Sequence, residues 1–183
     1  MKVKPLLEGK PFMTEYGIVG YSTVVLIACD DEKNILYDCG SKGCALQLKE
    51  ALEKAGMKPE DITHVVISHL HFDHVGNLPL FSNAEILLNK IEWESANQTP
   101  DEWHSIQTLA YLEKRGNLRF VKEGDIIAEE VSVMELPGHT PGLIGLRCGA
   151  ETILCSDAMK NRYELWKNIP LMSQNLEQSR KSI

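Results

Sequence analysis

Hydrophobic and polar positions along the first half of the chain follow two different periods. Residues 22–28 and 34–37 are short apolar runs rich in β-branched side chains, and the polar segment DDEKN between them predicts a hairpin of two strands. From residue 43 to 56 the apolar residues recur three or four positions apart, which predicts an amphipathic helix. The β-branched run 63–68 and the run 84–90 predict two further strands.

The second half of the chain is dominated by short apolar runs. Residues 100–116 have apolar side chains on one face and are predicted to be helical. After them, runs broken by Gly, Pro or acidic pairs predict several antiparallel strands, at residues 118–121, 125–128, 131–136, 143–148 and 152–155. Residues 175–183 are polar and compatible with a helix. With no repeat and no Pro/Ser-rich linker in 183 residues, we expect one domain, 1–183, of mixed α and β structure.

Composition and charge narrow the function classes. The 26 acidic and 19 basic residues give a net charge of -7, which disfavours nucleic acid as a partner, although a metal site would add local positive charge. No apolar run approaches the roughly 18 residues of a membrane-spanning helix, and the first residues lack the apolar core of a signal peptide. The five cysteines have no C-x-x-C spacing and are expected to be buried thiols, not disulfides or metal ligands. These features predict a cytoplasmic protein that does not enter the membrane.

The segment HLHFDH places four potential metal ligands within six positions, directly after the apolar run 63–68. In an extended segment residues two apart point the same way, so His69 and His71 can bind one ion. Asp73 and His74 follow at a turn and can face a second ion, as in two-metal hydrolases. Zinc accepts imidazole together with carboxylate, and manganese or iron would suit the same ligands.

A single histidine in this segment would most often be an ordinary loop residue or a hydrogen-bonded core group. Four such groups are harder to explain in that way. Burying them without compensation would cost several kcal/mol, which coordination of a metal would offset. The cluster as a whole therefore favours a metal site.

The segment SHLHFDHVGN resembles the H-x-H-x-D-H signature of the metallo-β-lactamase superfamily. Two later segments are similar to family motifs in the same order: PGHTPG (137–142) to the loop that bears a third histidine, and CSDA (155–158) to the strand end that bears a bridging aspartate. DCG (38–40) resembles the early D-x-G element of the family. The resemblance covers about residues 20–165.

This resemblance implies the fold and a ligand set. The fold would be α/β, a four-layer αββα sandwich with metals at one edge where the strand-end loops converge. The first ion would be held by His69, His71 and His139. Asp73 and His74 would hold the second ion, Asp157 would bridge the two, and Asp38 would support the ligands from behind. The cofactor would be two divalent metal ions, with zinc favoured over Mn or Fe.

One departure from the family pattern concerns the second ion. The family has a last histidine on a later strand-loop, whereas this sequence has no histidine after His139. We therefore expect a chain that lacks the C-terminal strand and helix of the fold, and a second metal site weaker than the first.

The reaction implied is hydrolysis of an ester-like bond in a small molecule, a lactone or thioester, by a metal-bound hydroxide, with Asp73 assisting the leaving group. Tyr163 and Trp166 follow Asp157 by six and nine positions, and either reach over the metals toward substrate or simply pack in a helix. Three alternatives stay open: a phosphodiesterase or ribonuclease of the same fold, an iron-dependent redox enzyme, and a non-catalytic domain with a decayed site. The sequence also leaves open whether the protein forms a homo-oligomer.

Overall fold

Two β-sheets form the centre of the protein, for which the computed structural model describes residues 1–15 and 17–183. The larger sheet has six strands in the order β1-β4-β5-β6-β7-β8, antiparallel from β1 to β5 and parallel from β5 to β8. Its strands are β1 (Lys2–Leu7), β4 (Val24–Ala28), β5 (Asn34–Tyr37), β6 (His64–Val66), β7 (Glu85–Asn89) and β8 (Leu118–Val121).

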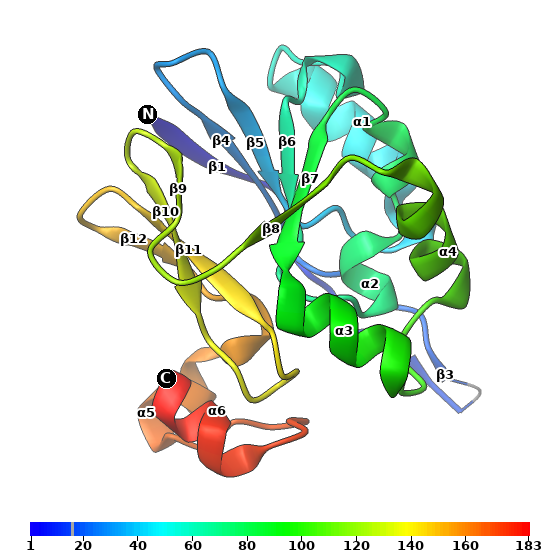
Figure 1. Cartoon of the computed structure of the whole chain (residues 1–183), viewed down its shortest axis with the longest axis vertical. Helices are drawn as coiled ribbons and strands as arrows, with labels where there is room; N and C mark the ends of the chain where they lie inside the picture. Colours follow the sequence, from blue (N-terminus) through cyan, green and yellow to red (C-terminus); the bar gives the residue numbers. More distant parts are fainter. Residues whose placement is uncertain (16) are drawn as a thin grey trace.

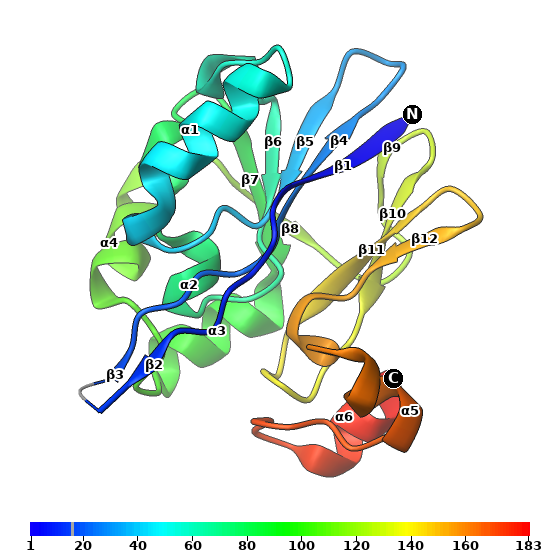
Figure 2. The same ribbon diagram turned by 180° about the vertical axis from the view of Figure 1, so that it is seen from behind.

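The second sheet is antiparallel throughout and has the order β12-β11-β10-β9. Its strands are β9 (Ile126–Ala128), β10 (Val131–Glu135), β11 (Ile144–Cys148) and β12 (Thr152–Leu154). A short ladder of β2 (Met13–Thr14) and β3 (Gly17–Ile18) extends away from both sheets (Figure 2).

The sheets pack face to face because side chains alternate along each strand. In β4, Val25 and Ile27 pack in a core shared with the second sheet, while Val24 and Leu26 pack in a core on the opposite face. That opposite face is covered by α1 (Ala45–Lys54) and α4 (Ile106–Arg115), whose buried leucines belong to the same core (Figure 1). Each such buried aliphatic side chain contributes about 1.5–3 kcal/mol.

The remaining helices lie near one end of the two sheets. These are α2 (Phe72–Val75), α3 (Lys90–Gln98), α5 (Arg162–Lys167) and α6 (Leu176–Ser182). The described residues also form four 3-10 turns: η1 (Lys42–Cys44), η2 (Pro59–Asp61), η3 (Leu78–Leu80) and η4 (Ser156–Ala158). Helices α1 to α4 lie on the side of the larger sheet, whereas α5 and α6 lie beyond the end of the second sheet (Figures 1 and 2). Strand ends and loops from both sheets therefore meet between these two groups of helices.

Most of the predicted elements are confirmed, including the hairpin of β4 and β5, the helix within 43–56 and the strands of the second sheet. The helix predicted over 100–116 is wrong in its first third, because α4 begins at Ile106. Asp101 accepts the Trp103 N–H and so holds these residues in a turn, and Ser105 accepts the Thr108 N–H, which makes it the N-cap at which α4 begins. Trp103 thus lies in a loop.

The antiparallel arrangement predicted from residue 118 onward is wrong for its first strand. β8 pairs with β7 in parallel and completes the larger sheet, and only the later strands form the antiparallel sheet. Parallel pairing needs a crossover connection, which α3 and α4 supply. The apolar pattern did not single out β1 or α3.

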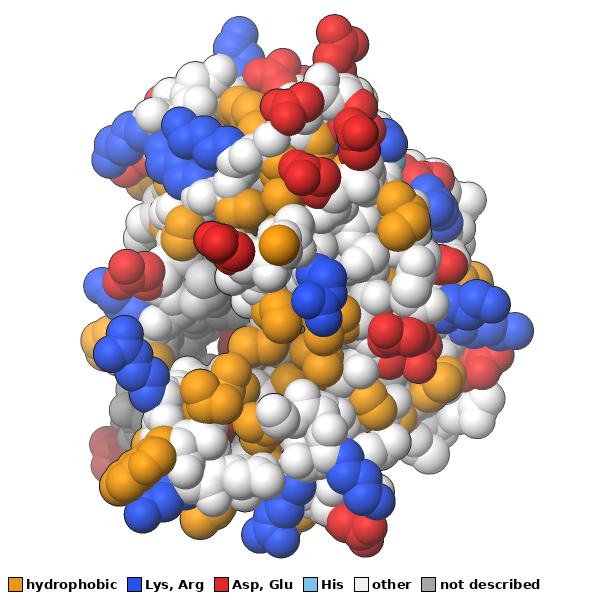
Figure 3. Space-filling view, turned by 90° about the vertical axis from the view of Figure 1, so that its left-hand side faces the viewer, with side chains coloured by type: hydrophobic (Ala, Val, Ile, Leu, Met, Phe, Trp, Pro, Cys, Tyr) orange, Lys and Arg blue, Asp and Glu red, His pale blue; other side chains and the backbone are white. Residues whose placement is uncertain are grey.

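Exposed apolar side chains gather on the side of the molecule that carries the second sheet and the C-terminal helices (Figure 3). They include Ile153 of β12 and Trp166 of α5. Among the described residues, no helix has both the length and the apolar composition needed to span a membrane. The five cysteines are free thiols; Cys39, Cys44 and Cys148 are buried as expected, whereas Cys29 and Cys155 are only partly buried.

Candidate metal centre

The predicted ligands all lie where the chain leaves a strand. The HLHFDH segment follows β6, which occupies an interior position of the larger sheet, so its backbone is fixed on both sides. His139 lies in the loop between β10 and β11, and Asp157 lies in η4 directly after β12. The face-to-face packing of the two sheets brings these three segments together.

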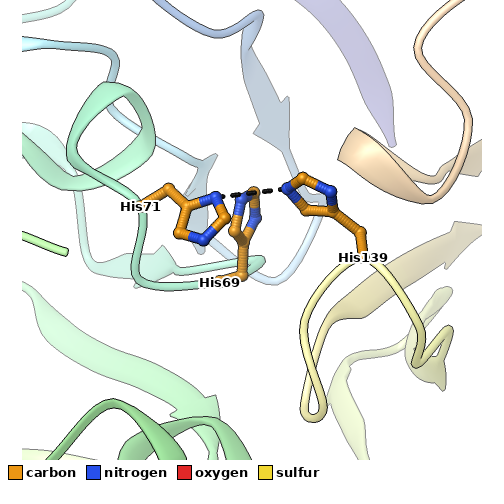
Figure 4. A group of neighbouring side chains, drawn as sticks. All are labelled: His69, His71 and His139. Carbon is orange, nitrogen blue, oxygen red and sulfur yellow. Dashed lines mark hydrogen bonds between the residues drawn. The ribbon is translucent and has the colours of Figure 1, made fainter. Parts of the chain in front are cut away.

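His69, His71 and His139 form the first group of the site (Figure 4). Their ring centroids are 4.5 Å apart for His69 and His71, 4.8 Å for His69 and His139, and 4.9 Å for His71 and His139. Nε2 of His139 lies 3.2 Å from Nδ1 of His71. One ligand nitrogen from each ring lies within 4.8 Å of the others, a separation that a single ion can bridge.

Neighbouring groups decide which nitrogen of each ring carries the proton. Nδ1 of His139 lies 2.6 Å from the carbonyl oxygen of Met172 and donates a hydrogen bond to it, which leaves a lone pair on Nε2. Nδ1 of His69 lies 3.0 Å from Oγ of Ser68, whose own hydroxyl donates to Asp38. Nε2 of His69 is buried and has no hydrogen-bond partner among the described residues. These free lone pairs fit a metal ion.

Burial keeps the three rings neutral. It lowers the pKa of His69 well below the ordinary value, with neighbouring histidines adding to the effect. Burial, together with His139, lowers the pKa of His71 to about 3, although Asp101 opposes the shift. The pKa of His139 is also lowered by burial. Neutral imidazole is the form that coordinates a metal.

The second group is built around His74. Its Nε2 lies 3.6 Å from Oδ2 of Asp73 and 3.7 Å from Oδ1 of Asp157. The other oxygen of Asp157, Oδ2, lies 3.4 Å from Nε2 of His139 in the first group. Asp157 thus presents one oxygen to each group, which is the placement expected of a bridging ligand. The ring of His69 lies 4.0 Å from that of His74, and a ligand atom of each, with one from Asp157, lies within 4.8 Å of the others, so the two groups adjoin at His69.

Burial and neighbouring charges shift the pKa values of Asp73, Asp157 and His74, the three residues of the second group. Burial, with the charge of Asp157 adding to it, raises the pKa of Asp73. Burial acts in the same direction on Asp157, but the charges of His74 and other cationic neighbours outweigh it and lower the pKa of that carboxyl. Burial opposes a charge on His74 as well, yet the nearby carboxylates, Asp38 first, raise its pKa to about 9.

Asp38 lies beneath both groups and is 1% exposed. Its Oδ1 accepts the Ser68 N–H at 2.8 Å, and its Oδ2 accepts the Ser68 hydroxyl at 2.8 Å and Nδ1 of His74 at 2.9 Å. The backbone of Asp38 has a positive φ of 58°, which turns the chain sharply at the end of β5. One carboxylate therefore orients His74 directly and His69 through Ser68.

Replacing Asp38 by asparagine is expected to weaken the second metal site by about 10- to 100-fold, the usual scale for a group that orients a metal ligand. The retained oxygen would keep the Ser68 N–H, so the amide NH2 would face His74 Nδ1 and disfavour the proton there. Metal content per chain after dialysis measures this. Asp61→Asn is the control, since Asp61 accepts the Lys58 N–H at an exposed turn. Wild-type metal content in the Asp38 variant would contradict the role.

The loop 99–105 adds two groups that sequence reasoning missed. Oδ2 of Asp101 lies 3.4 Å from Nε2 of His71, and Nδ1 of His104 lies 2.7 Å from Oδ1 of Asp101. Phe72 donates its N–H to the Trp103 carbonyl at 2.9 Å, so this loop is aligned with the ligand segment. The sequence did not indicate Asp101 and His104 as site residues, because in the predicted helix over 100–116 both would lie on a solvent-exposed first turn.

Glu92 of α3 is a third residue near the site that the sequence did not reveal. It is 1% exposed, accepts the Leu70 N–H at 2.9 Å and the Gly142 N–H at 3.1 Å, and its pKa is raised by burial. Leu70 lies between His69 and His71, and Gly142 lies in the loop of His139. A Cβ on Gly142 would collide with the backbone of Glu92, so glycine is required for this close approach.

The ligands line an open cleft of about 870 Å³. Apolar side chains form much of its wall: Tyr21, Phe72, Trp103, Ile153, Met159 and Leu171. Tyr163 does not line this cleft; it is 55% exposed and packs against Trp166, with ring centroids 6.4 Å apart. Contact of Tyr163 with a substrate therefore stays a prediction.

Comparison with known families gives a match over most of the chain. The model of the metallo-β-lactamase superfamily matches residues 17–156. The chain belongs to the metallo-β-lactamase superfamily. Within this superfamily, an N-acyl homoserine lactonase of Bacillus cereus is 32% identical over 137 residues, which cover 72% of this chain and 52% of the lactonase. The chain spans about half the length of the first curated relatives that it matches.

Solved structures agree on the superfamily fold. A Thermotoga maritima protein described as a metallo-β-lactamase has a TM-score of 0.80 at 22% identity, covering 97% of this chain and 88% of that protein. A variant of AiiA from B. thuringiensis, solved with N-decanoyl-L-homoserine at its active site, has a TM-score of 0.76 at 20% identity, covering 93% and 77%. The expected superfamily and its α/β fold are therefore confirmed.

Proposed function

We propose that this protein is a metal-dependent hydrolase that cleaves a lactone or a related ester-like bond in a small molecule. The observation that carries the proposal is the convergence of three neutral imidazoles with Asp157, which presents one carboxylate oxygen to each half of the site. Imidazoles combined with a carboxylate are the donor set of catalytic zinc sites, so zinc is the expected metal. Bound ions would supply a nucleophile from water at neutral pH and polarise the carbonyl.

The residues of the chain would bind the ions, donate a proton and contact the substrate. His69, His71 and His139 would hold the first ion, and His74 with Asp73 and Asp157 would hold the second. Burial raises the pKa of Asp73, so this carboxyl is suited to carry the proton that the departing alkoxide needs when the ester bond breaks. The apolar wall of the cleft, with Phe72 and Trp103 stacked 6.5 Å apart, suits a hydrocarbon portion of the substrate and reduces access of bulk water.

The relatives favour a lactone over the other ester-like bonds. The Bacillus cereus relative is named an N-acyl homoserine lactonase, and the solved AiiA variant holds an acylated homoserine. An acyl chain would match the apolar wall, and an opened lactone would present its carboxylate to the metal ligands. The single domain 1–183, the cytoplasmic location and the oligomeric state are further expectations, which stay predictions.

Removal of metal is expected to abolish hydrolysis reversibly. Dialysis against a strong chelator should bring turnover of an N-acyl lactone to the background rate, and added zinc should restore it. The test screens lactones, thioesters and a bis-nitrophenyl phosphate with the same protein, and determines metal content by elemental analysis. Lactone turnover that survives the loss of all metal, or turnover of the phosphodiester alone, would contradict the proposed function.

A further inference from the structure

Asp101 is a carboxylate close to the metal centre that belongs to neither ligand group. It lies in the loop before α4, 28 positions after Asp73 in the chain. The side chain is only 29% exposed although it points into an open cleft. Such a carboxylate would normally be solvated, so its fixed position next to a buried histidine needs an explanation.

The carboxylate is held on both oxygens. Oδ1 accepts the Trp103 N–H at 2.9 Å and lies 2.7 Å from Nδ1 of His104. Oδ2 accepts a hydrogen bond from Nε2 of Gln174 at 2.9 Å. Gln174 also donates its backbone N–H to the carbonyl of His139 at 3.2 Å. Two distant segments of the chain therefore fix one carboxylate, and one of them also holds a ligand loop.

The same Oδ2 lies 3.4 Å from Nε2 of His71. This nitrogen is buried and makes no hydrogen bond within the described part of the chain, while Nδ1 of the same ring faces His139. A small rotation of either side chain would bring Nε2–H into a hydrogen bond with the carboxylate. Histidines that bind a metal through one nitrogen usually donate the other N–H to such a partner.

Resting on the metal site of the proposed function, we propose that Asp101 is a positioning residue for the first ion. It holds the proton of His71 on Nε2, so that the lone pair of Nδ1 points to the place where His69 and His139 converge. The Trp103 N–H and the Gln174 side chain keep the carboxylate in place, and Nδ1 of His104 accepts the backbone N–H of Asp101 at 3.1 Å. Three geometric observations support this assignment. The His71 ring is buried, its Nε2 has no hydrogen-bond partner among the described residues, and both oxygens of the Asp101 carboxylate are held by hydrogen bonds.

Asp101→Asn is the informative variant because it preserves size. The amide oxygen must remain toward the Trp103 N–H, so the NH2 group takes the place of Oδ2 and faces Nε2 of His71. A donor there favours a lone pair on Nε2 and a proton on Nδ1, the wrong nitrogen for the ion. Zinc affinity at the first site is expected to fall by about 10- to 100-fold.

Two readouts on the zinc-loaded protein test the assignment. Competition with a chromophoric chelator measures zinc affinity, and ¹H–¹⁵N spectra of the histidine rings report an Nε2–H signal of His71, which the variant should lose or shift. Asp125→Asn is the matched control: Asp125 accepts the Lys122 N–H at 3.0 Å in a turn of the second sheet, and this variant should change neither readout.

Three outcomes would overturn the assignment. In the first, Asp101→Asn changes neither the zinc affinity nor the ring signal of His71; in the second, it lowers the affinity no more than Asp125→Asn does. In the third, Asp101→Asn loses a whole zinc equivalent at saturation, which would make Asp101 a metal ligand instead. If the wild-type protein bound no zinc, the proposed function would fail first. If wild type binds zinc and hydrolyses lactone while Asp101→Asn behaves identically, only the positioning role fails.

Discussion

Replacing His71 by alanine is expected to remove the first metal ion and to lower lactone hydrolysis by about a thousandfold. The reason is geometric, because Nδ1 of His71 lies 3.2 Å from Nε2 of His139 and is one of three nitrogens that face one another. Without it, the first ion would keep two imidazoles and one oxygen of Asp157, a carboxylate that it would share with the second ion, so it would be bound far more weakly. Loss of a group that stabilises the transition state has an effect of this order. Elemental analysis and initial rates measure the two parts of the prediction.

His64→Ala provides the matched control for His71. His64 begins the strand β6 that leads into the ligand segment, but its ring faces Glu85 at 3.7 Å, at the end of the strand away from the ligands. This variant should retain metal and activity. Wild-type metal content or wild-type turnover in the His71 variant would contradict the ligand assignment.

Local constraints explain why part of the site could be predicted from the sequence. His69, His71, Asp73 and His74 lie within six positions after an apolar run, so their proximity follows from the strand end and the turn. His139, Asp157 and Asp38 are far from these positions in the chain. Only the resemblance to a family connected them to the cluster, and the structure places each of them within 4 Å of a residue in it.

The supporting residues could not be predicted, because their roles depend on contacts between distant segments. Asp101 meets Gln174 across 73 positions, and Glu92 meets Gly142 across 50. In the sequence, an acidic residue among polar neighbours indicates a solvated helix face, as for Glu92 in KIEWESANQ. The early start predicted for α4 failed for a related reason: the Asp101 side chain holds a turn through the Trp103 N–H, and Ser105 caps the helix only from Ile106 onward.

Glu92 connects the two loops that supply the first metal site. Its two carboxylate oxygens accept one N–H from the segment of His69 and His71 and one from the loop of His139. The carboxylate is 1% exposed, so bulk water cannot replace it as acceptor. The side chain therefore fixes the distance between the two loops as well as satisfying both donors.

Glu92→Ala is expected to lower the free energy of unfolding by about 2–6 kcal/mol, because two buried N–H groups would lose their acceptor at about 1–3 kcal/mol each. Zinc affinity should fall as well, since the loops could then move apart. Urea unfolding of the zinc-loaded protein and chelator competition measure the two effects. Glu94→Ala is the control on the same helix; its carboxylate is half-exposed and pairs with Lys90 at 3.5 Å, so its removal should cost less than about 0.5 kcal/mol. If the two variants unfold at the same urea concentration, Glu92 does not hold the loops together, and the strand ends alone must fix the spacing of the three histidines.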